Sequence, residues 1–160
     1  MTCTIISRGD ELKLVCKNEN EPPYPEIKAK LREKIWELYC KGYDRFWVNC
    51  EYGVPLWCGE TITALAMYND IELNIAMPYE EQSTNWVEEH RDRFFRLHAD
   101  SDNVEIISHH YTDNCYNLAD EYMIDDSDLL LVVGTHTDCY GASYAKENGI
   151  KVEQLLIPLT

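Results

Sequence analysis

Residues 128–133 have the sequence Asp-Leu-Leu-Leu-Val-Val, and Gly134 follows them. An unbroken apolar run of this length is typical of a strand that is covered on both faces of a sheet. The next segment, 139–148, favours a short helix, because Gly149 stands at its end as a C-cap. A last strand is predicted over residues 150–157. A strand, a helix and a second strand in this order predict two parallel strands joined by a crossover helix.

The same alternation extends back to the N-terminus. The clearest helix covers residues 25–41, because its apolar residues recur every three or four positions and so share one face. Pro25 in the first turn and Gly42 after the last are typical helix boundaries. The residues of the apolar face are Ile27, Leu31, Ile35 and Leu38. Further helices are predicted over 55–68, 80–98 and 114–125, and further strands over 2–6, 12–16, 45–49, 71–76 and 103–108.

This alternation predicts an open, doubly wound α/β fold with a mostly parallel sheet. Helices on both faces of such a sheet give a three-layer α/β/α sandwich, and 160 residues are expected to form one domain, 1–160. In the charged helix predicted over 80–98, Val87, Phe94 and Leu97 are expected to face inward. Trp86 and Phe95 are likewise expected to belong to the core rather than to a stacking platform.

The charge of the chain excludes several partners. It has 14 Lys and Arg against 29 Asp and Glu, a formal net charge of −15. Such a surface repels the phosphates of nucleic acids and anionic membranes, and no Lys/Arg-rich run offsets it. We therefore expect neither nucleic acid nor membrane as a partner. A homo-oligomer and a basic protein partner remain open.

The cysteines and the N-terminal residues predict the cellular compartment of the protein. Seven cysteines are an odd number in a chain that is long enough to fold without disulfides, which favours free thiols in a reducing cytoplasm. No apolar run approaches the ~20 residues of a membrane span. Residues 1–6 lack the basic and long apolar regions of a signal peptide. A cytoplasmic protein is expected.

The loops after the strands form the candidate site, because ligands of doubly wound sheets bind beyond the carboxyl ends of the strands. These loops contain no G-x-G-x-x-G, Walker A or G-x-S-x-G motif. No cofactor is therefore expected. No metal site is expected either, because the neighbouring His109 and His110 would point to opposite sides and no C-x-x-C pair exists.

Three side chains in or near these loops have alternative interpretations. Cys50 precedes a helix, whose N-terminus can activate a thiolate, but a buried structural cysteine is the default. Glu51 and Glu60 could serve as acid, base or nucleophile in glycosidic chemistry, or could be solvated or capping carboxylates.

Several stretches occur in an order and spacing that resembles a known family. Residues 74–82, followed by Asn85 and Trp86, resemble the segment after the third strand of the YpsA-like family, part of the SLOG superfamily of Rossmann-like proteins. Gly53, Val54, Trp57 and Glu60 resemble that family's G-V-D-x-W-A-A-E helix start. Further similarity lies in Ile107, Ser108 and Tyr111, in residues 122–130, and in Tyr140, Ala145 and Gly149.

The resemblance implies a Rossmann-like fold that binds nucleotides or nucleotide-derived ligands. The ligand loops depart from the family. Where the family has T-G-H-R-P and S-G-x-A-x-G-x-D, residues 6–10 are I-S-R-G-D and residues 48–55 are V-N-C-E-Y-G-V-P. Glycines let backbone N–H groups approach a phosphate closely, so their replacement is expected to weaken phosphate binding.

The resulting prediction is a degenerate, non-catalytic site for a nucleotide-derived or nucleoside-like ligand. One alternative is an N-glycosidase or deoxyribosyltransferase that uses Glu51 or Glu60; another is an acidic protein-interaction module. The residues expected to bind the ligand are Ser7, Arg8, Asn49, Cys50, Gly53, Pro78, Gly134, Thr135 and His136.

Overall fold

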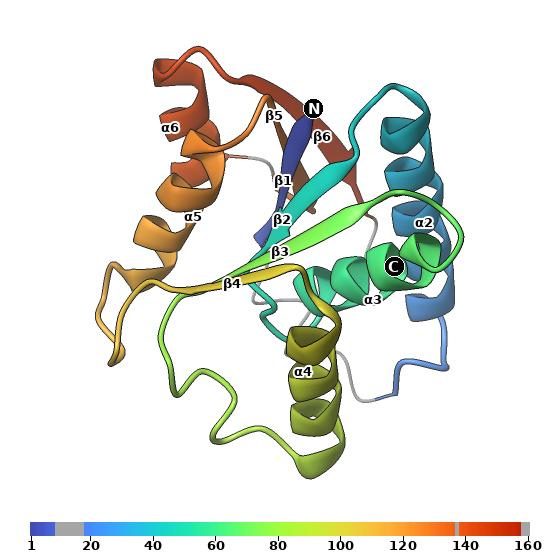
Figure 1. Ribbon diagram of the computed structural model, residues 1–160, viewed down its shortest axis with the longest axis vertical. Helices are drawn as coiled ribbons and strands as arrows, with labels where there is room; N and C mark the ends of the chain where they lie inside the picture. The colour runs from blue at the N-terminus through green and yellow to red at the C-terminus, as the bar shows by residue number, and fades with distance from the viewer. Residues whose placement is uncertain (9–17, 137, 158–160) are drawn as a thin grey trace.

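The computed structural model describes residues 1–8, 18–136 and 138–157, and of Arg8 only the backbone. Six strands form one all-parallel sheet in the order β4-β3-β2-β1-β5-β6 (Figure 1). The strands are β1 (Thr2–Arg8), β2 (Arg45–Val48), β3 (Glu72–Met77), β4 (Asn103–Ile106), β5 (Leu129–Gly134) and β6 (Lys151–Leu156). The described helices are α2 (Tyr24–Cys40), α3 (Val54–Ala66), α4 (Glu88–Asp100), α5 (Cys115–Asp125) and α6 (Tyr140–Glu147).

Helices cover both faces of the sheet. Helices α2, α3 and α4 lie on one face, and α5 and α6 lie on the other (Figure 1). Each face buries its own apolar cluster, one around Leu31 and Phe46 and the other around Met123 and Val132. The Rossmann-like three-layer α/β/α fold expected from the sequence is therefore confirmed.

Strand β5 is an apolar strand covered on both faces, as its sequence predicts. All six of its residues are buried, and it pairs with β1 on one side and β6 on the other. Helix α2 also follows its pattern, since the four residues of its apolar face are buried. Gly42 ends the helix with φ 101°, a conformation that side chains other than glycine rarely adopt.

The start of helix α4 differs from the start that the sequence predicts. It begins at Glu88 rather than at residue 80, because residues 80–86 form consecutive turns after β3. These turns are closed by backbone hydrogen bonds such as that from Gln82 N–H to the Tyr79 carbonyl oxygen, 3.3 Å between N and O. Val87 is consequently the residue that precedes the helix, and it is 61% exposed rather than inward-facing.

The neighbours Phe94 and Phe95 have opposite environments. Phe94 is 1% exposed and Leu97 3%, as expected, but Phe95 is 56% exposed, so its assignment to the core was wrong. Adjacent helical residues are rotated by about 100°, so a narrow apolar stripe can include only one of them. Trp86 is partly buried and packs against the core of the α2–α4 face.

The remaining boundaries differ by a few residues from those predicted. Strand β1 continues to Arg8, and β4 ends at Ile106 with all four residues exposed at the edge of the sheet. The strand predicted over 12–16 lies outside the described residues. Within the described part, no helix has the length and apolar character needed to cross a membrane.

Candidate functional site

The strand order brings several predicted site residues to one edge of the sheet. Strands β2, β3 and β4 lie on one side of β1, whereas β5 and β6 lie on the other side, so the strand order reverses between β1 and β5. The ends of β1 and β5 are aligned, with Ser7 opposite Val133 and Arg8 opposite Gly134. Strand β2 lies on the other side of β1 and leads into the loop that starts at Asn49. The carboxyl ends of the strands beside such a switch point are where doubly wound sheets place ligands.

Asn49 shapes its own loop. It is 8% exposed, and its Oδ1 accepts a hydrogen bond from Glu51 N–H at 3.0 Å. Its carbonyl oxygen accepts another from Gln82 Nε2 at 3.1 Å. The Asn49 side chain is therefore turned back onto its own loop.

Cys50 is a buried structural cysteine. It is 0% exposed and has φ 59°, in the left-handed region that non-glycine residues seldom adopt. Burial raises the pKa of its thiol well above the usual value, and the charges of Glu60 and Glu51 act in the same direction. A thiol that stays protonated is a poor nucleophile, so the geometry favours the structural alternative.

We expect the exposed Cys40 to be alkylated rapidly by iodoacetamide at pH 8, whereas Cys50 stays unmodified in the folded protein. Mass spectrometry of the digested protein locates the modified residues. In denaturant, both cysteines should react, which provides the control. Modification of Cys50 in the native state at the rate of Cys40 would show an accessible thiolate and contradict this assignment.

Glu51 is the centre of a polar cluster that joins three segments. Its Oε2 accepts a hydrogen bond from Gln82 Nε2 at 3.0 Å and a second from the phenol of Tyr116. Gln82 belongs to the turns after β3, and Tyr116 lies in the first turn of α5. Gln82 is 3% exposed, and its Oε1 has no hydrogen-bond donor within the described residues.

Two further tyrosines, Tyr79 and Tyr111, extend this cluster from Tyr116. The ring of Tyr79 lies 5.4 Å from that of Tyr111 and 6.3 Å from that of Tyr116, measured between centroids. Burial raises the pKa of Tyr116, and the charge and hydrogen bonding of Glu51 raise it further. The phenol therefore remains protonated at neutral pH and can donate to the carboxylate.

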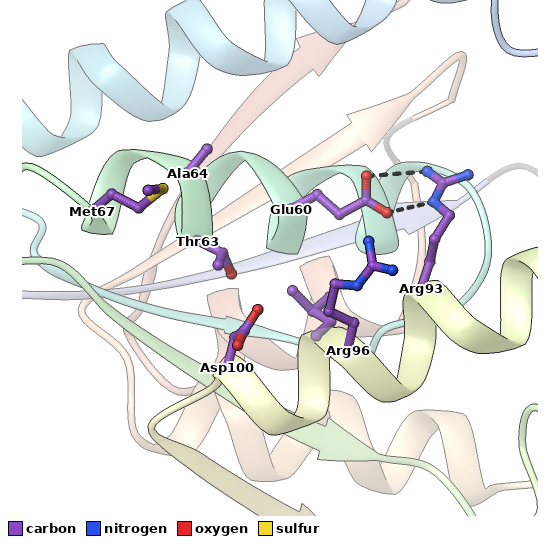
Figure 2. A pocket seen from close by; sticks show the side chains of 8 residues that line it. Glu60, Thr63, Ala64, Met67, Arg93, Arg96 and Asp100 are labelled. Carbon is purple, nitrogen blue, oxygen red and sulfur yellow. Dashed lines mark hydrogen bonds and ion pairs between the residues drawn. The ribbon is translucent and has the colours of Figure 1, made fainter.

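Glu60 belongs to a different environment. Arg93 on α4 binds it through two hydrogen bonds, Nε to Oε1 at 2.7 Å and Nη2 to Oε2 at 3.1 Å (Figure 2). Both residues line a cavity of about 390 Å³ between α3 and α4. The other residues that line it are Thr63, Ala64, Met67, Arg96, Leu97 and Asp100. Glu60 is thus an ion-pair partner, and the structure does not bring it into the cluster around Glu51.

Glu19 completes the ion pair of Arg93. Its carboxylate accepts hydrogen bonds from Arg93 and from Trp57 Nε1, and Lys28 Nζ lies 3.5 Å from its Oε1. Burial acts to raise the pKa of Glu19, but the hydrogen bonds and charge of Arg93 outweigh it and lower the pKa. The network links the segment before α2 to α3 and α4.

The remaining predicted residues are arranged around the strand ends. Gly53 precedes α3 with φ 107° and has open space where a Cβ would lie. Pro78 is buried directly after β3, Thr135 is half-buried after β5, and His136 is exposed. Whether they contact a ligand remains a prediction.

Among the residues placed by the structure, each of the two histidines after β4 lies beside one carboxylate. His109 Nδ1 is 3.6 Å from Glu80 Oε2, and His110 Nδ1 is 3.2 Å from Glu81 Oε1. No group of three or more metal-ligating side chains occurs among the residues that the structure describes.

The candidate loops after β3 and β4 include Tyr79 and Tyr111, although the sequence does not single out either as a ligand-binding residue, whereas sequence reasoning misses Gln82 and Tyr116. Gln82 lies in the loop after β3, which is the position of a site loop, but the helix predicted from residue 80 concealed this signal. Tyr116 is 65 residues from Glu51 in the sequence, so no local pattern could pair them.

The parallel sheet with helices on both faces and its switch point define a Rossmann-like α/β protein. Comparison with known proteins identifies the family. The YpsA family model, described as the YspA SLOG family, matches residues 8–153. The chain belongs to this SLOG family, as its resemblance to the YpsA-like proteins implied.

Three relatives from Bacillus species share the designation UPF0398. The UPF0398 proteins of Bacillus cereus strain B4264 and Bacillus thuringiensis strain Al Hakam are each 28% identical over 119 residues, 72% of this chain and 65% of theirs. That of Bacillus cereus strain G9842 is 27% identical over 122 residues, 74% of this chain and 66% of its own. The chain thus matches somewhat less than two thirds of the length of these relatives.

Proposed function

We propose that the chain binds a nucleotide-derived or nucleoside-like small molecule at the carboxyl edge of its sheet and does not transform it. The observation that carries the proposal is the Glu51 carboxylate, held by Gln82 and Tyr116 in the loop that precedes α3. A few fixed polar groups beside the switch point are typical of a ligand site in such folds. The SLOG resemblance supports the nucleotide-derived class.

The charges of this edge favour a nucleoside-like ligand over one rich in phosphate. The carboxylates of Glu51 and Glu81 are both close enough to Tyr79 to raise its pKa, after the effect of burial. Each of these charges repels a phosphate group. The base and sugar of a nucleoside, in contrast, offer N–H and O–H donors that a carboxylate accepts.

Binding without catalysis is favoured by the environments of the candidate catalytic groups. Glu60 is paired with Arg93 in the cavity between α3 and α4. Cys50 is buried with a raised pKa. Glu51 already accepts two hydrogen bonds on one oxygen, which positions it as a fixed acceptor.

Thermal unfolding with added ligand tests the proposal, because a ligand that binds only the folded state stabilises it. Adenosine at ten times its Kd should add about 1.4 kcal/mol of stability, a Tm rise of about 3–5 °C. The rise should be smaller for Glu51→Gln, and smaller for adenosine triphosphate at the same concentration. No Tm rise with any nucleoside or nucleotide would contradict the proposal and favour the protein-interaction alternative.

The enzymatic alternative rests on the carboxylate of Glu51 at this edge. An N-glycosidase would release free base from a nucleoside, and Glu51→Gln would abolish the release if Glu51 served as acid, base or nucleophile. We expect no free base by liquid chromatography from the wild type. Base release that is lost in Glu51→Gln and retained in Glu60→Gln would establish catalysis at Glu51.

A further inference from the structure

The rings of Tyr79, Tyr111 and Tyr116 beside Glu51 form two edge-to-face pairs. The ring of Tyr79 makes an angle of 80° with that of Tyr111 and 69° with that of Tyr116. The three rings come from three segments: the residues directly after β3, the loop after β4 and the first turn of α5. Tyr111 is 59% exposed and Tyr79 half-buried, so the cluster can be reached from solvent.

The chemistry of this tyrosine cluster favours a positive charge. The face of an aromatic ring is electron-rich and attracts a cation, and the exposed ring of Tyr111 beside Tyr79 offers such a face. Glu51 adds a carboxylate that is hydrogen-bonded to Tyr116, one of the three rings. Glu80 and Glu81 follow Tyr79 directly, and the histidines beside them are 86% and 81% exposed.

We propose that the tyrosine cluster and Glu51 select an organic cation, namely a positively charged heteroaromatic base or an alkylammonium group. The inference rests on the proposed function, because it specifies the charge of the small molecule bound at the same edge. A cation placed against the rings of Tyr79 and Tyr111 gains cation–π attraction that a neutral isostere lacks. It also gains the charge of Glu51, which a neutral base can use only as a hydrogen-bond acceptor.

Matched neutral and cationic probes test the inference by isothermal titration calorimetry. Adenosine is neutral at pH 7, whereas 1-methyladenosine is cationic and differs by one methyl group and one proton. We expect 1-methyladenosine to bind about 10-fold more tightly. Choline should likewise bind more tightly than its neutral isostere 3,3-dimethylbutan-1-ol.

The outcomes separate this inference from the proposed function. Equal affinities for adenosine and 1-methyladenosine would overturn the cation preference and leave nucleoside binding intact. Binding of choline without binding of either nucleoside would support the cation preference and overturn the nucleoside ligand. Absence of binding by all four probes would overturn both.

Variants test whether the cation binds at the tyrosine cluster. Tyr111→Leu should reduce the affinity for 1-methyladenosine about 5- to 10-fold, while Tyr111→Phe retains it, because phenylalanine keeps the aromatic face. Glu51→Gln should remove most of the preference for the methylated nucleoside. Tyr68→Leu is the matched control, since Tyr68 is 88% exposed after α3 and should not affect binding. An unchanged affinity in both Tyr111→Leu and Glu51→Gln would place the cation elsewhere and contradict the inference.

Discussion

Phe94→Ala should lower the free energy of unfolding by about 3–5 kcal/mol, the usual cost of removing a buried phenylalanine ring. The ring is 1% exposed and contacts the rings of Trp86 and His98, at centroid distances of 5.2 and 4.1 Å. Its removal would leave a cavity under α4. Urea unfolding measures this loss. The slope m, which is the change in the free energy of unfolding with urea concentration, should be unchanged if the variant leaves the folded and unfolded states as compact as in the wild type.

Phe95→Ala is the matched control on the same helix. Phe95 is 56% exposed, so we expect a change of about 1 kcal/mol or less. Equal losses in the two variants would mean that α4 presents a different face to the sheet than the structure assigns.

Arg93→Met should destabilise the protein by about 2–3 kcal/mol at pH 7, because it leaves Glu19 and Glu60 without their shared cation. The side chain of Arg93 is only 18% exposed, and that of Glu19 15%, so solvent screens these pairs less than it screens surface pairs. Helix α4 would lose its polar connection to α3 and to the segment before α2.

The destabilisation caused by Arg93→Met should decrease as the pH falls. The pKa of Glu19 is lowered from its ordinary value of 4.5, so ionised Glu19 stabilises the folded state above that pH. This contribution disappears as the pH falls through the lowered pKa. The stability difference between wild type and Arg93→Met should therefore shrink as the pH falls below 4.5.

Arg96→Met provides the control for this series. Arg96 lines the same cavity, and among the described residues no ion pair to it is found. Its replacement should change stability by about 0.5 kcal/mol or less at any pH. A pH-independent loss in Arg93→Met, equal to that in Arg96→Met, would show that the network contributes packing rather than charge.

The fold could be predicted because its signals are local. The apolar run of β5 and the single apolar face of α2 each lie within one element, where burial and periodicity are read from neighbouring residues. The start of α4 could not be predicted in this way. The turns over 80–86 are charged and polar like a helix surface, and Gln82 is buried by contacts with Asn49 and Glu51 far away in the sequence.

The site could be predicted only as an edge of the sheet. The alternation of elements predicts parallel strands, whose carboxyl ends share one edge, and the observed strand order places Ser7, Asn49 and Gly134 on that edge. The roles of individual side chains depend on contacts that the sequence does not encode locally. Glu51 meets Gln82 and Tyr116 across 31 and 65 residues, and these contacts distinguish it from Glu60.

Chemical-shift perturbation of the backbone amides during titration with adenosine is the most direct test of where a ligand binds. We predict that the largest changes occur in residues 49–53, 79–82 and 111–116, around Glu51. Changes concentrated instead in residues 60–67 and 93–100, along the cavity between α3 and α4, would contradict ligand binding at the carboxyl edge of the sheet.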